Sequence, residues 1–227
     1  MSQESKSPRL VLRVRRRRLA DLAGMTLHQN RSGGDLRHVD PDRTPLNRTL
    51  VGSGNPGADV RAAIDAISSQ NLLNEVAALR ATRGKKAANE RLRRGPEDPW
   101  DAKNAAPWNE MILSASPEWF RAPGQGPGEF DGDRAEAFAA RARSVLRQRF
   151  GAGLVHLALH LDEETPHLHA AVLPIVRKRS GRRGLQRLVS HRQHETFREH
   201  DAQDEMFRER SYERLQTEMA SDFASLG

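Results

Sequence analysis

The chain has 227 residues, of which 37 are Lys or Arg and 30 are Asp or Glu, and it contains no cysteine. At this length we expect one decorated domain or two small ones, with a core that needs no disulfides. The missing cysteines exclude a disulfide framework, a thiolate metal site and a cysteine nucleophile. No apolar run approaches the ~20 residues that span a bilayer, and the N-terminal sequence lacks the apolar core of a secretory signal. We therefore expect no membrane segment and a cytoplasmic protein.

The charge balance points to the class of partner. The formal net charge is +7 and the sequence pI is about 10.6. This excess favours a polyanion, with nucleic acid as the leading class, whereas the alternative is a charge that only keeps the protein soluble. Aromatic residues make up 5% of the chain, with Tyr212 as its one tyrosine. We therefore expect phosphate contacts, rather than bases stacked on many aromatic side chains, to dominate binding.

The first predicted elements are a strand, a long loop and a helix. Apolar and charged residues alternate over residues 9–15, as in a half-buried strand. The arginine run after it predicts either a phosphate-contacting edge or an edge whose charge blocks aggregation. Residues 30–57 are rich in Gly, Pro, Asn and Asp and predict a long loop. Within it, Asn55-Pro56 caps a helix whose apolar residues continue at helical spacing to about residue 80.

The second half of the chain predicts further strands and helices. Residues 81–108 are basic and without usable periodicity, so we expect a connecting loop or a partly ordered insertion. The elements predicted after it are a strand over 109–115, a short helical turn after Ser116, a helix over 133–150 that ends at Gly151, and strands over 153–161 and 167–175. The basic stretch 176–187 then leads into a charged helical tail, with Phe207, Leu215, Met219 and Phe223 as one buried stripe.

The most informative stretch is VHLALHLDEETPHLHAAVLPI, residues 155–175. On a strand, His167 and His169 point the same way about 7 Å apart, and an antiparallel partner strand brings His160 over the same spot. Three imidazoles with an open position are typical of a catalytic metal site. The alternative is a structural role, in which these histidines only form hydrogen bonds within the core. An HExxH protease motif is absent, and no glutamate follows HxH as a cupin-like site requires.

The remaining histidines give weaker signals. His156 has no partner at a known spacing, and we expect it to support a metal ligand or to be structural. For His191, His194 and His200, which lie in the charged tail, we expect solvated surface positions.

The spacing also resembles a known family. His160 to His169 reads HLDEETPHLH, which is similar to the HxDExTPHxH signature of the MobV group of plasmid mobilisation relaxases, also called Pre/Mob or plasmid recombination enzymes, within the HUH endonucleases. LHQNRSGG, residues 27–34, resembles the family's N-terminal HxxR motif, with His28 and Arg31 at its fixed positions. VDPDRTPLN, residues 39–47, is similar to the second motif through Arg43 and Asn47. Arg48 departs from the family, which has an aromatic residue there.

The resemblance implies a fold, a reaction and a set of partners. The fold is α/β, of the α+β type, with a central, mainly antiparallel sheet that carries the histidine site and is flanked by helices. The reaction is metal-dependent nicking and rejoining of one DNA strand at a plasmid transfer origin, with Mn²⁺ or Mg²⁺ held by His160, His167 and His169. The partners are origin DNA, as a hairpin plus single strand, and the conjugative coupling machinery. Arg31, Arg43 and Asn47 would contact the DNA, the arginines by clamping phosphates.

The nucleophile follows from the same resemblance. Tyr212 lies far from the N-terminal position that most HUH relaxases use, and the residues alone leave serine, lysine, carboxylate or histidine open. The family implies His28, which would form a covalent 5′-phosphate intermediate. Glu163 is the candidate that accepts its proton, and Asp162 the candidate that orients a ligating imidazole. The alternative for both carboxylates is that they cap the turn.

Three other functions compete with this interpretation. A metal-dependent hydrolase would use the same histidines to activate water and would leave no covalent adduct. A non-catalytic DNA-binding module would keep its function without metal. Nucleotide binding through GSGNPG, residues 52–57, is disfavoured because no parallel βαβ pattern surrounds it.

The expected domain division is a relaxase domain over residues 1–190 and a charged helical extension over 191–227 that packs on or beside it. MobV proteins usually continue into a further C-terminal part, so we expect this chain to be a relaxase domain or a short homologue. Within this division, every residue predicted for the site falls in the first part.

Overall fold

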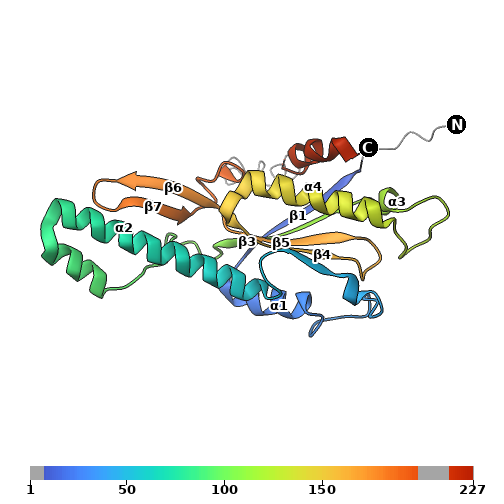
Figure 1. Ribbon diagram of the computed structural model, residues 1–227, viewed down its shortest axis with the longest axis horizontal. Helices are drawn as coiled ribbons and strands as arrows, with labels where there is room; N and C mark the ends of the chain where they lie inside the picture. Colours follow the sequence, from blue (N-terminus) through green and yellow to red (C-terminus); the bar gives the residue numbers. More distant parts are fainter. Residues whose placement is uncertain (1–7, 199–214, 227) are drawn as a thin grey trace.

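The computed structural model describes residues 8–198 and 215–226, and its centre is a five-stranded sheet (Figure 1). The strand order is β1-β3-β5-β4-β2, and every neighbouring pair is antiparallel. The strands are β1 (Leu10–Arg17), β2 (Arg48–Val51), β3 (Trp108–Ala115), β4 (Leu154–His160) and β5 (His167–Val172). This architecture confirms the predicted α+β fold with a central antiparallel sheet and flanking helices.

One face of the sheet carries the larger hydrophobic core. Because side chains alternate along a strand, Met111 and Leu113 of β3 share this face with Leu157 and Leu159 of β4. They pack against α4 (Gly132–Phe150) and the helix over residues 215–223, which cover this side in Figure 1. Of the predicted tail stripe, Leu215, Met219 and Phe223 are buried here, whereas Phe207 lies outside the described residues.

The opposite face of the sheet is only partly covered. Its second core cluster joins Leu22 and Met25 of α1 (Leu22–Gln29) to Val60, Ile64 and Ile67 of α2 (Pro56–Arg93) and to Ala171 of β5. Both helices lie against one end of this face. The other end of the face is left to polar side chains, and there His160, His167 and His169 lie.

The helix that begins at Asn55-Pro56 is longer than its pattern predicts. The Asn55 side chain accepts a hydrogen bond from the Ala58 N–H, and α2 (Pro56–Arg93) then runs to Gly84, whose φ of 81° reverses the chain. The residues after Gly84 return as a second helical piece, and Arg91 donates to Glu75 at 2.9 Å with both side chains buried. The prediction of a loop over residues 81–108 was therefore wrong up to Arg93, because this long-range ion pair stabilises the returning helix.

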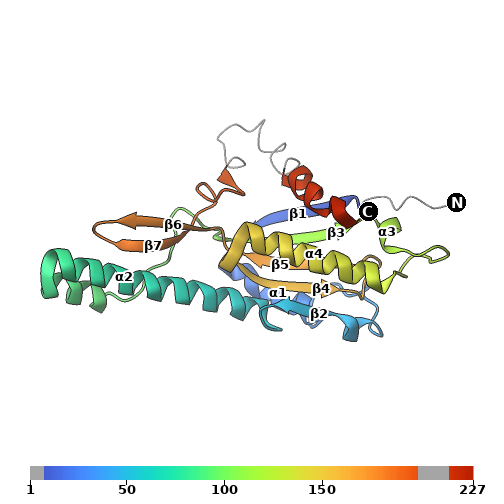
Figure 2. The ribbon, with the colours of Figure 1, turned by 45° about the horizontal axis from the view of Figure 1, so that its top comes forward.

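Two further segments differ from prediction. Residues 30–57 are not one loop, since β2 lies within them as an exposed edge strand beside β4. The basic stretch 176–187 does not lead directly into a helix but forms most of an antiparallel ribbon, β6 (Ile175–Ser180) and β7 (Gly184–Val189). The ribbon and α2 run side by side away from the sheet in both views (Figures 1 and 2), joined by hydrogen bonds from Asn71 and Asn74 to β7 carbonyls.

The remaining elements are short. They are α3 (Pro117–Phe120) and the 3₁₀ turns at Leu19–Asp21, Thr44–Leu46, Gly151–Gly153 and Ala224–Leu226. The short turn predicted after Ser116 is α3, and α4 ends at Gly151 as predicted, where φ is 52°. Among the described residues, none of the helices combines the length and hydropathy that a bilayer span needs.

Candidate active site

The three histidines predicted as metal ligands come together on β4 and β5. His160 pairs directly with His167 across the two strands, and His169 lies two residues further along the same face. The ring centroids are 5.2 Å apart for His160 and His167, 5.1 Å for His167 and His169, and 4.8 Å for His160 and His169. The period-two reasoning from the sequence therefore placed all three imidazoles in one cluster.

A fourth imidazole reaches the cluster from α1. His28, in the last turn of that helix, has its ring centroid 4.9 Å from that of His169 and 5.7 Å from that of His160. Two overlapping groups offer ligand atoms that lie within 4.8 Å of one another: His28 with His160 and His169, and His160 with Glu163 and His167. The cluster can thus hold a cation in more than one way, with His28 or Glu163 beside the predicted ligands.

Two of the predicted ligands already have a suitable orientation. His167 Nδ1 lies 3.0 Å from the Thr165 carbonyl oxygen, which accepts its proton and leaves Nε2 free. His169 Nδ1 has Glu110 Oε1 as its nearest carboxylate oxygen, at 3.6 Å, beyond hydrogen-bond distance. Metal-bound histidines usually direct the second ring nitrogen at a carbonyl or carboxylate. His167 and His169 therefore match the pattern of metal ligands.

His160 is held differently. Its Nδ1 lies 3.1 Å from Arg31 Nη2 and its Nε2 lies 2.9 Å from Gln29 Oε1. A guanidinium can only donate, so Nδ1 accepts and Nε2 carries the proton that Gln29 receives. To bind a cation through Nε2, His160 must lose its hydrogen bond to Gln29 and must carry its proton on Nδ1 instead of Nε2.

The pKa values of His28, His160 and His169 are all lowered in the cluster. Burial lowers the pKa of His160, and the neighbouring His169, His167 and Arg31 lower it further. Burial likewise lowers the pKa of His169 to about 4, although Glu110 opposes the change. The pKa of His28 is lowered by burial and then by Arg31. At neutral pH these rings are therefore unprotonated, as both a metal ligand and a nitrogen nucleophile must be.

Arg31 ends α1 and ties it to the cluster. The Ser32 N–H donates to Leu27 O at 3.0 Å and the Arg31 N–H to His28 O at 3.2 Å, which is the pattern of a Schellman helix end. Arg31 occupies the left-handed position, with φ of 52°, where glycine is usual. Its side chain compensates for that strain by donating to Asp162 at 2.9 Å through Nε and at 2.5 Å through Nη2.

Asp162 is the centre of this network. Besides Arg31, its carboxylate accepts from Thr44 Oγ1 at 3.0 Å and from Asn47 Nδ2 at 2.7 Å, and its side chain is fully buried. Burial works to raise the pKa of Asp162, but the hydrogen bonds from Arg31 and Asn47 outweigh it and the pKa is lowered. The predicted role of orienting a ligating imidazole is indirect here, because Arg31 stands between Asp162 and His160.

The residues predicted to contact DNA are occupied by the protein itself. Arg31 also donates to Glu163 at 2.9 Å, and Arg43 donates to Asp40, Gly128 O and Glu163 O at 2.8, 2.5 and 3.1 Å. Asn47 accepts from the Leu161 N–H at 2.7 Å. These contacts fasten the turn between β4 and β5 to the end of α1. This geometry favours positioning roles for Arg31, Arg43 and Asn47 rather than free phosphate clamps.

The sequence analysis missed part of the cluster's surroundings. Glu110 of β3 is buried beside His169 and accepts from Arg17 Nε at 2.9 Å; these two neighbours outweigh the effect of burial and lower its pKa to about 2. Glu110 is a carboxylate on the strand face opposite Met111, a signal that alternation could have revealed. Arg13, Arg15 and Arg17 of β1 line a hollow of about 550 Å³ with His28 and His169.

The other histidines take no direct part in the cluster. His156 is buried, and its Nδ1 lies 2.9 Å from Asp59 Oδ2, which indicates a structural role. The prediction that His191 and His194 are solvated was wrong. They are 3% and 6% exposed, because His194 packs against Phe150 and both histidines pack against Phe197. His200 and Tyr212 lie outside the described residues. Arg48, where the family has an aromatic residue, forms an ion pair with Glu136 of α4.

Comparison with protein families decides where this cluster belongs. Residues 99–221, more than half of the chain, match the family model described as plasmid recombination enzyme. The chain belongs to the plasmid recombination enzyme family. The match includes β3, α4, β4 and β5, and hence three of the four clustered histidines.

Individual relatives are more distant. A protein of Zymomonas mobilis subsp. mobilis, called 65 kDa protein, is 29% identical over 150 residues, which cover 66% of this chain and 20% of the relative. The chain thus spans about one fifth of the length of that relative. Two Mn-bound crystal structures of the MobM relaxase domain with plasmid pMV158 oriT DNA align with TM-scores of 0.55 and 0.52, at 17% and 18% identity. Each alignment covers 92% of this chain and 86% of the other, and it shows a shared fold.

Proposed function

We propose that this protein is a relaxase that nicks and rejoins one strand of plasmid DNA at a transfer origin, through a covalent bond between His28 and the 5′ phosphate. The observation that carries the proposal is the position of His28. Its neutral ring lies beside His160 and His169 at the point where two open hollows, of about 550 and 560 Å³, meet. A scissile phosphate that enters either hollow would lie beside His28 and His169, which line both.

A divalent cation, Mn²⁺ or Mg²⁺, fits the cluster by its chemistry. His169 directs Nδ1 at Glu110, His167 presents an Nε2 without a hydrogen bond, and burial lowers the pKa of His160 and His169. His160, His167 and His169 would hold the cation, with Glu163 or His28 as a further ligand. The bound cation would neutralise charge on the phosphoryl oxygens and orient the phosphate for in-line attack. Mn-bound relaxase domains with the same fold support this proposal.

The chain's own residues would carry out the exchange of bonds. A ring nitrogen of His28 forms a bond to phosphorus, the bond from phosphorus to the 3′ oxygen breaks, and that oxygen takes up a proton as a free 3′ hydroxyl. The proton that His28 loses passes to a carboxylate, which then donates it to the leaving 3′ oxygen. Glu163 lines the same hollow as His28, and no hydrogen bond joins the two in this structure. Apo geometry does not exclude such a base, because catalytic hydrogen bonds often tighten only when substrate binds.

Arg31 has a distinct part in this proposal. Its Nη1 lies 3.4 Å from His28 Nε2, so it favours the tautomer whose lone pair is on Nε2. Together with Asp162 it fixes the end of α1 and hence the position of the nucleophile. We assign positioning to Arg31, Arg43 and Asn47, and phosphate contact to two β1 arginines that line the hollow, Arg13 and Arg15.

One observation favours a second candidate, the metal-dependent hydrolase. His28 belongs to a group with His160 and His169 whose ligand atoms lie close enough for one cation. If His28 is a ligand, its lone pair is not available for attack, and water would become the nucleophile. The two functions differ in a covalent intermediate, which only the relaxase forms.

The deciding experiment is a nicking assay on a supercoiled plasmid that carries the DNA flanking this gene, with Mn²⁺ or EDTA. We expect metal-dependent nicking and a protein–DNA adduct on a denaturing gel, which His28→Gln abolishes. A phosphorus–nitrogen bond is cleaved in mild acid, so the adduct should disappear at low pH, unlike a hydroxyl-linked ester. Nicking without an adduct would establish the hydrolase, and an adduct in His28→Gln would place the nucleophile elsewhere.

The division at residue 190 stays a proposal. In it, residues 1–190 hold the relaxase machinery and 191–227 pack on it. Four residues of the second part are buried in the same hydrophobic cluster as the apolar side chains of α4, which supports packing of this part on the first: Phe197, Leu215, Met219 and Phe223. Origin DNA, as hairpin plus single strand, and the conjugative coupling machinery are the partners that follow from the proposed reaction.

A further inference from the structure

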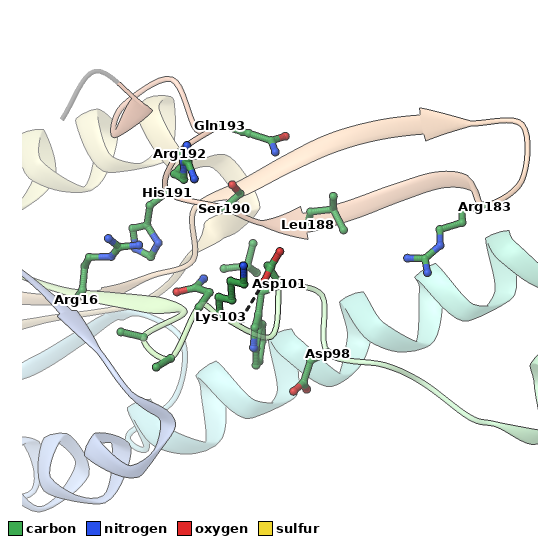
Figure 3. A pocket seen from close by; sticks show the side chains of 15 residues that line it. Arg16, Asp98, Asp101, Lys103, Arg183, Leu188, Ser190, His191, Arg192 and Gln193 are labelled. Atoms are coloured by element: carbon green, nitrogen blue, oxygen red, sulfur yellow. Dashed lines mark hydrogen bonds between the residues drawn. The ribbon is translucent and has the colours of Figure 1, made fainter. Parts of the chain in front are cut away.

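A cavity lies away from the histidine cluster, at the base of the β6–β7 ribbon. It measures about 780 Å³ and is enclosed by the segment over 98–106, the end of β7 with the residues after it, and Arg16 of β1. Figure 3 shows Arg16 and His191 at one end and Arg183 toward the other. We call it the ribbon-base cavity. None of its lining residues belongs to the candidate active site.

The lining of this cavity favours an anion. Four cationic side chains face two carboxylates; these residues are Arg16, Lys103, Arg183, Arg192, Asp98 and Asp101. One carboxylate is already used, because Asp101 Oδ1 accepts from the Lys103 N–H at 2.8 Å (Figure 3). Guanidinium groups match the geometry of a phosphate, and lysine adds a compact charge.

A buried histidine, His191, is among the residues that line the cavity. His191 is 3% exposed, and its Nε2 lies 2.9 Å from Asn109 Nδ2. Its other nitrogen, Nδ1, has no hydrogen-bond partner among the described residues. Buried polar groups without partners are rare and costly in folded proteins, and they often indicate a bound molecule. A ligand that offers polar atoms to His191 and negative charge to the rim satisfies both features.

Trp100 adds an aromatic surface to the same lining. It is partly exposed, whereas Trp108 and Trp119 are 0% and 9% exposed. An indole face at the edge of a cationic cavity is a platform on which a nucleobase stacks, and stacking of this kind tolerates any base. The cationic side chains, His191 and the indole of Trp100 together favour a nucleotide as the ligand of this cavity.

The position of the cavity connects it to the active site through β1. Arg13 pairs with Ile112, which pairs with His169, so this part of β1 lies beside the cluster. Arg16 lies three residues further, or about 10 Å along the strand. Because β1 is an edge strand, a DNA strand can pass over it from the arginines of one face to Arg16 on the other.

We propose that the ribbon-base cavity binds one unstacked nucleotide of the single strand that extends from the histidine cluster. The nucleotide's phosphate contacts Arg16, Lys103 or Arg192, its base stacks on Trp100, and a polar atom of the base meets His191. The choice of a DNA strand rather than a free nucleotide rests on the proposed function and on the row of arginines that joins the two sites. The cavity then extends the footprint of the enzyme beyond the reacting phosphate.

The test measures binding without nicking. Fluorescein-labelled oligothymidylates of about 8 and about 24 nucleotides are titrated by anisotropy with EDTA present, since one DNA-binding domain covers roughly 4–16 nucleotides. We expect Trp100→Leu, which keeps an apolar side chain, to weaken binding of the longer oligonucleotide about 5- to 100-fold. Lys103→Gln with Arg192→Gln should lower the magnitude of the salt slope by about 0.7 for each phosphate that the variant no longer neutralises. Arg143→Gln, on the exposed side of α4, is the matched control for charge.

Tryptophan fluorescence gives a second readout from Trp100. DNA should quench the wild-type emission, and Trp100→Leu should lose that quenching while its circular dichroism stays unchanged. Equal affinity of the variants and the wild type for the long oligonucleotide would overturn the proposal. Quenching by thymidine monophosphate but not by DNA would also overturn it, in favour of a free nucleotide. Failure of the relaxase function itself would appear separately, as a wild-type protein that binds DNA and forms no adduct.

Discussion

The histidine cluster and the β6–β7 ribbon differ in whether their charged side chains form ion pairs. Around the cluster, Arg31 pairs with Asp162 at 2.5 Å and with Glu163 at 2.9 Å, and Arg31 and Asp162 are almost fully buried. On the ribbon, Arg177 lies directly opposite Arg187. Five cations there form no ion pair with any residue that the structure describes: Arg177, Lys178, Arg179, Arg182 and Arg187.

This difference in charge pairing indicates different roles for the two regions: the cluster suits a reaction, and the ribbon suits the binding of a polyanion. Paired, buried charges keep the reacting groups in one geometry, which an enzyme needs before its substrate arrives. Unpaired, exposed arginines repel one another across a strand pair, and a polyanion relieves that repulsion. We therefore expect changes at the cluster to alter stability and reaction, and changes on the ribbon to alter mainly DNA binding.

The largest effect is expected at the centre of the cluster's network. Asp162→Ala leaves the buried Arg31 without its main partner, and removal of one partner of a buried ion pair costs about 3–5 kcal/mol. We expect urea denaturation to show this decrease and nicking to disappear with it. Glu164→Ala, in the same turn but with a side chain that is 72% exposed, should stay within about 0.5 kcal/mol of the wild type. Equal stability of the two variants would remove Asp162 from the centre of the network.

Metal binding gives the next effect. At a concentration about a hundredfold above its dissociation constant, Mn²⁺ should stabilise the folded protein by about 2.7 kcal/mol, seen as a rise in Tm. His169→Ala should abolish that rise, because it removes one of the clustered imidazoles that offer ligand atoms to a single cation. His38→Ala, with its side chain 50% exposed, is the control. A rise of equal size in His169→Ala would show that the cation binds elsewhere.

Acid should destabilise the fold through the buried histidines. Burial and then Arg16 lower the pKa of His191 to about 3, against about 6.5 in the unfolded chain. Between those values the unfolded chain binds a proton that the folded protein does not, so the free energy of unfolding falls as pH falls. His191→Gln should flatten this dependence by up to about 1.4 kcal/mol per pH unit between pH 6 and roughly 4. Identical profiles for variant and wild type would contradict burial as the cause.

The smallest effect on stability is expected on the ribbon. Arg177→Gln removes a like-charge pair, so the protein should become more stable by about 0.2–1 kcal/mol. Its affinity for duplex DNA should nevertheless fall, with the salt slope reduced by about 0.9 for each phosphate that is no longer neutralised. Thermal denaturation and anisotropy titrations at several salt concentrations measure the two effects. A decrease in both stability and affinity would mean that the ribbon is structural.

Prediction from the sequence succeeded where the pattern is local. Alternation on β4 and β5 brings His160, His167 and His169 to one face, and the Asn55-Pro56 cap fixes the start of α2, so these features needed no tertiary information. It failed where distant residues decide. The chain reverses at Gly84 and returns as a helix that the ion pair between Arg91 and Glu75 stabilises. Residues 48–51 form a strand because β4 pairs with them.

The histidines outside the cluster give the same lesson. His191 and His194 carry charged neighbours in sequence, yet Phe150 of the distant α4 stacks on His194, and the nearby Phe197 packs against both histidines. The roles of Arg31 and Asn47 were equally hidden, since a motif shows which residues occur together and not which of them face solvent. Their common partner, Asp162, is more than a hundred positions away.

The left-handed end of α1 has a consequence for biosynthesis. Arg31 and the carboxylate that holds it are 131 residues apart. At a translation rate of about 5–20 residues per second, the helix that carries His28 leaves the ribosome roughly 7–26 seconds before its anchor does. Until then, nothing compensates for the strained backbone at Arg31, and the imidazole has no fixed direction. A nascent chain therefore carries His28 before the carboxylate that fixes the end of its helix has been synthesised.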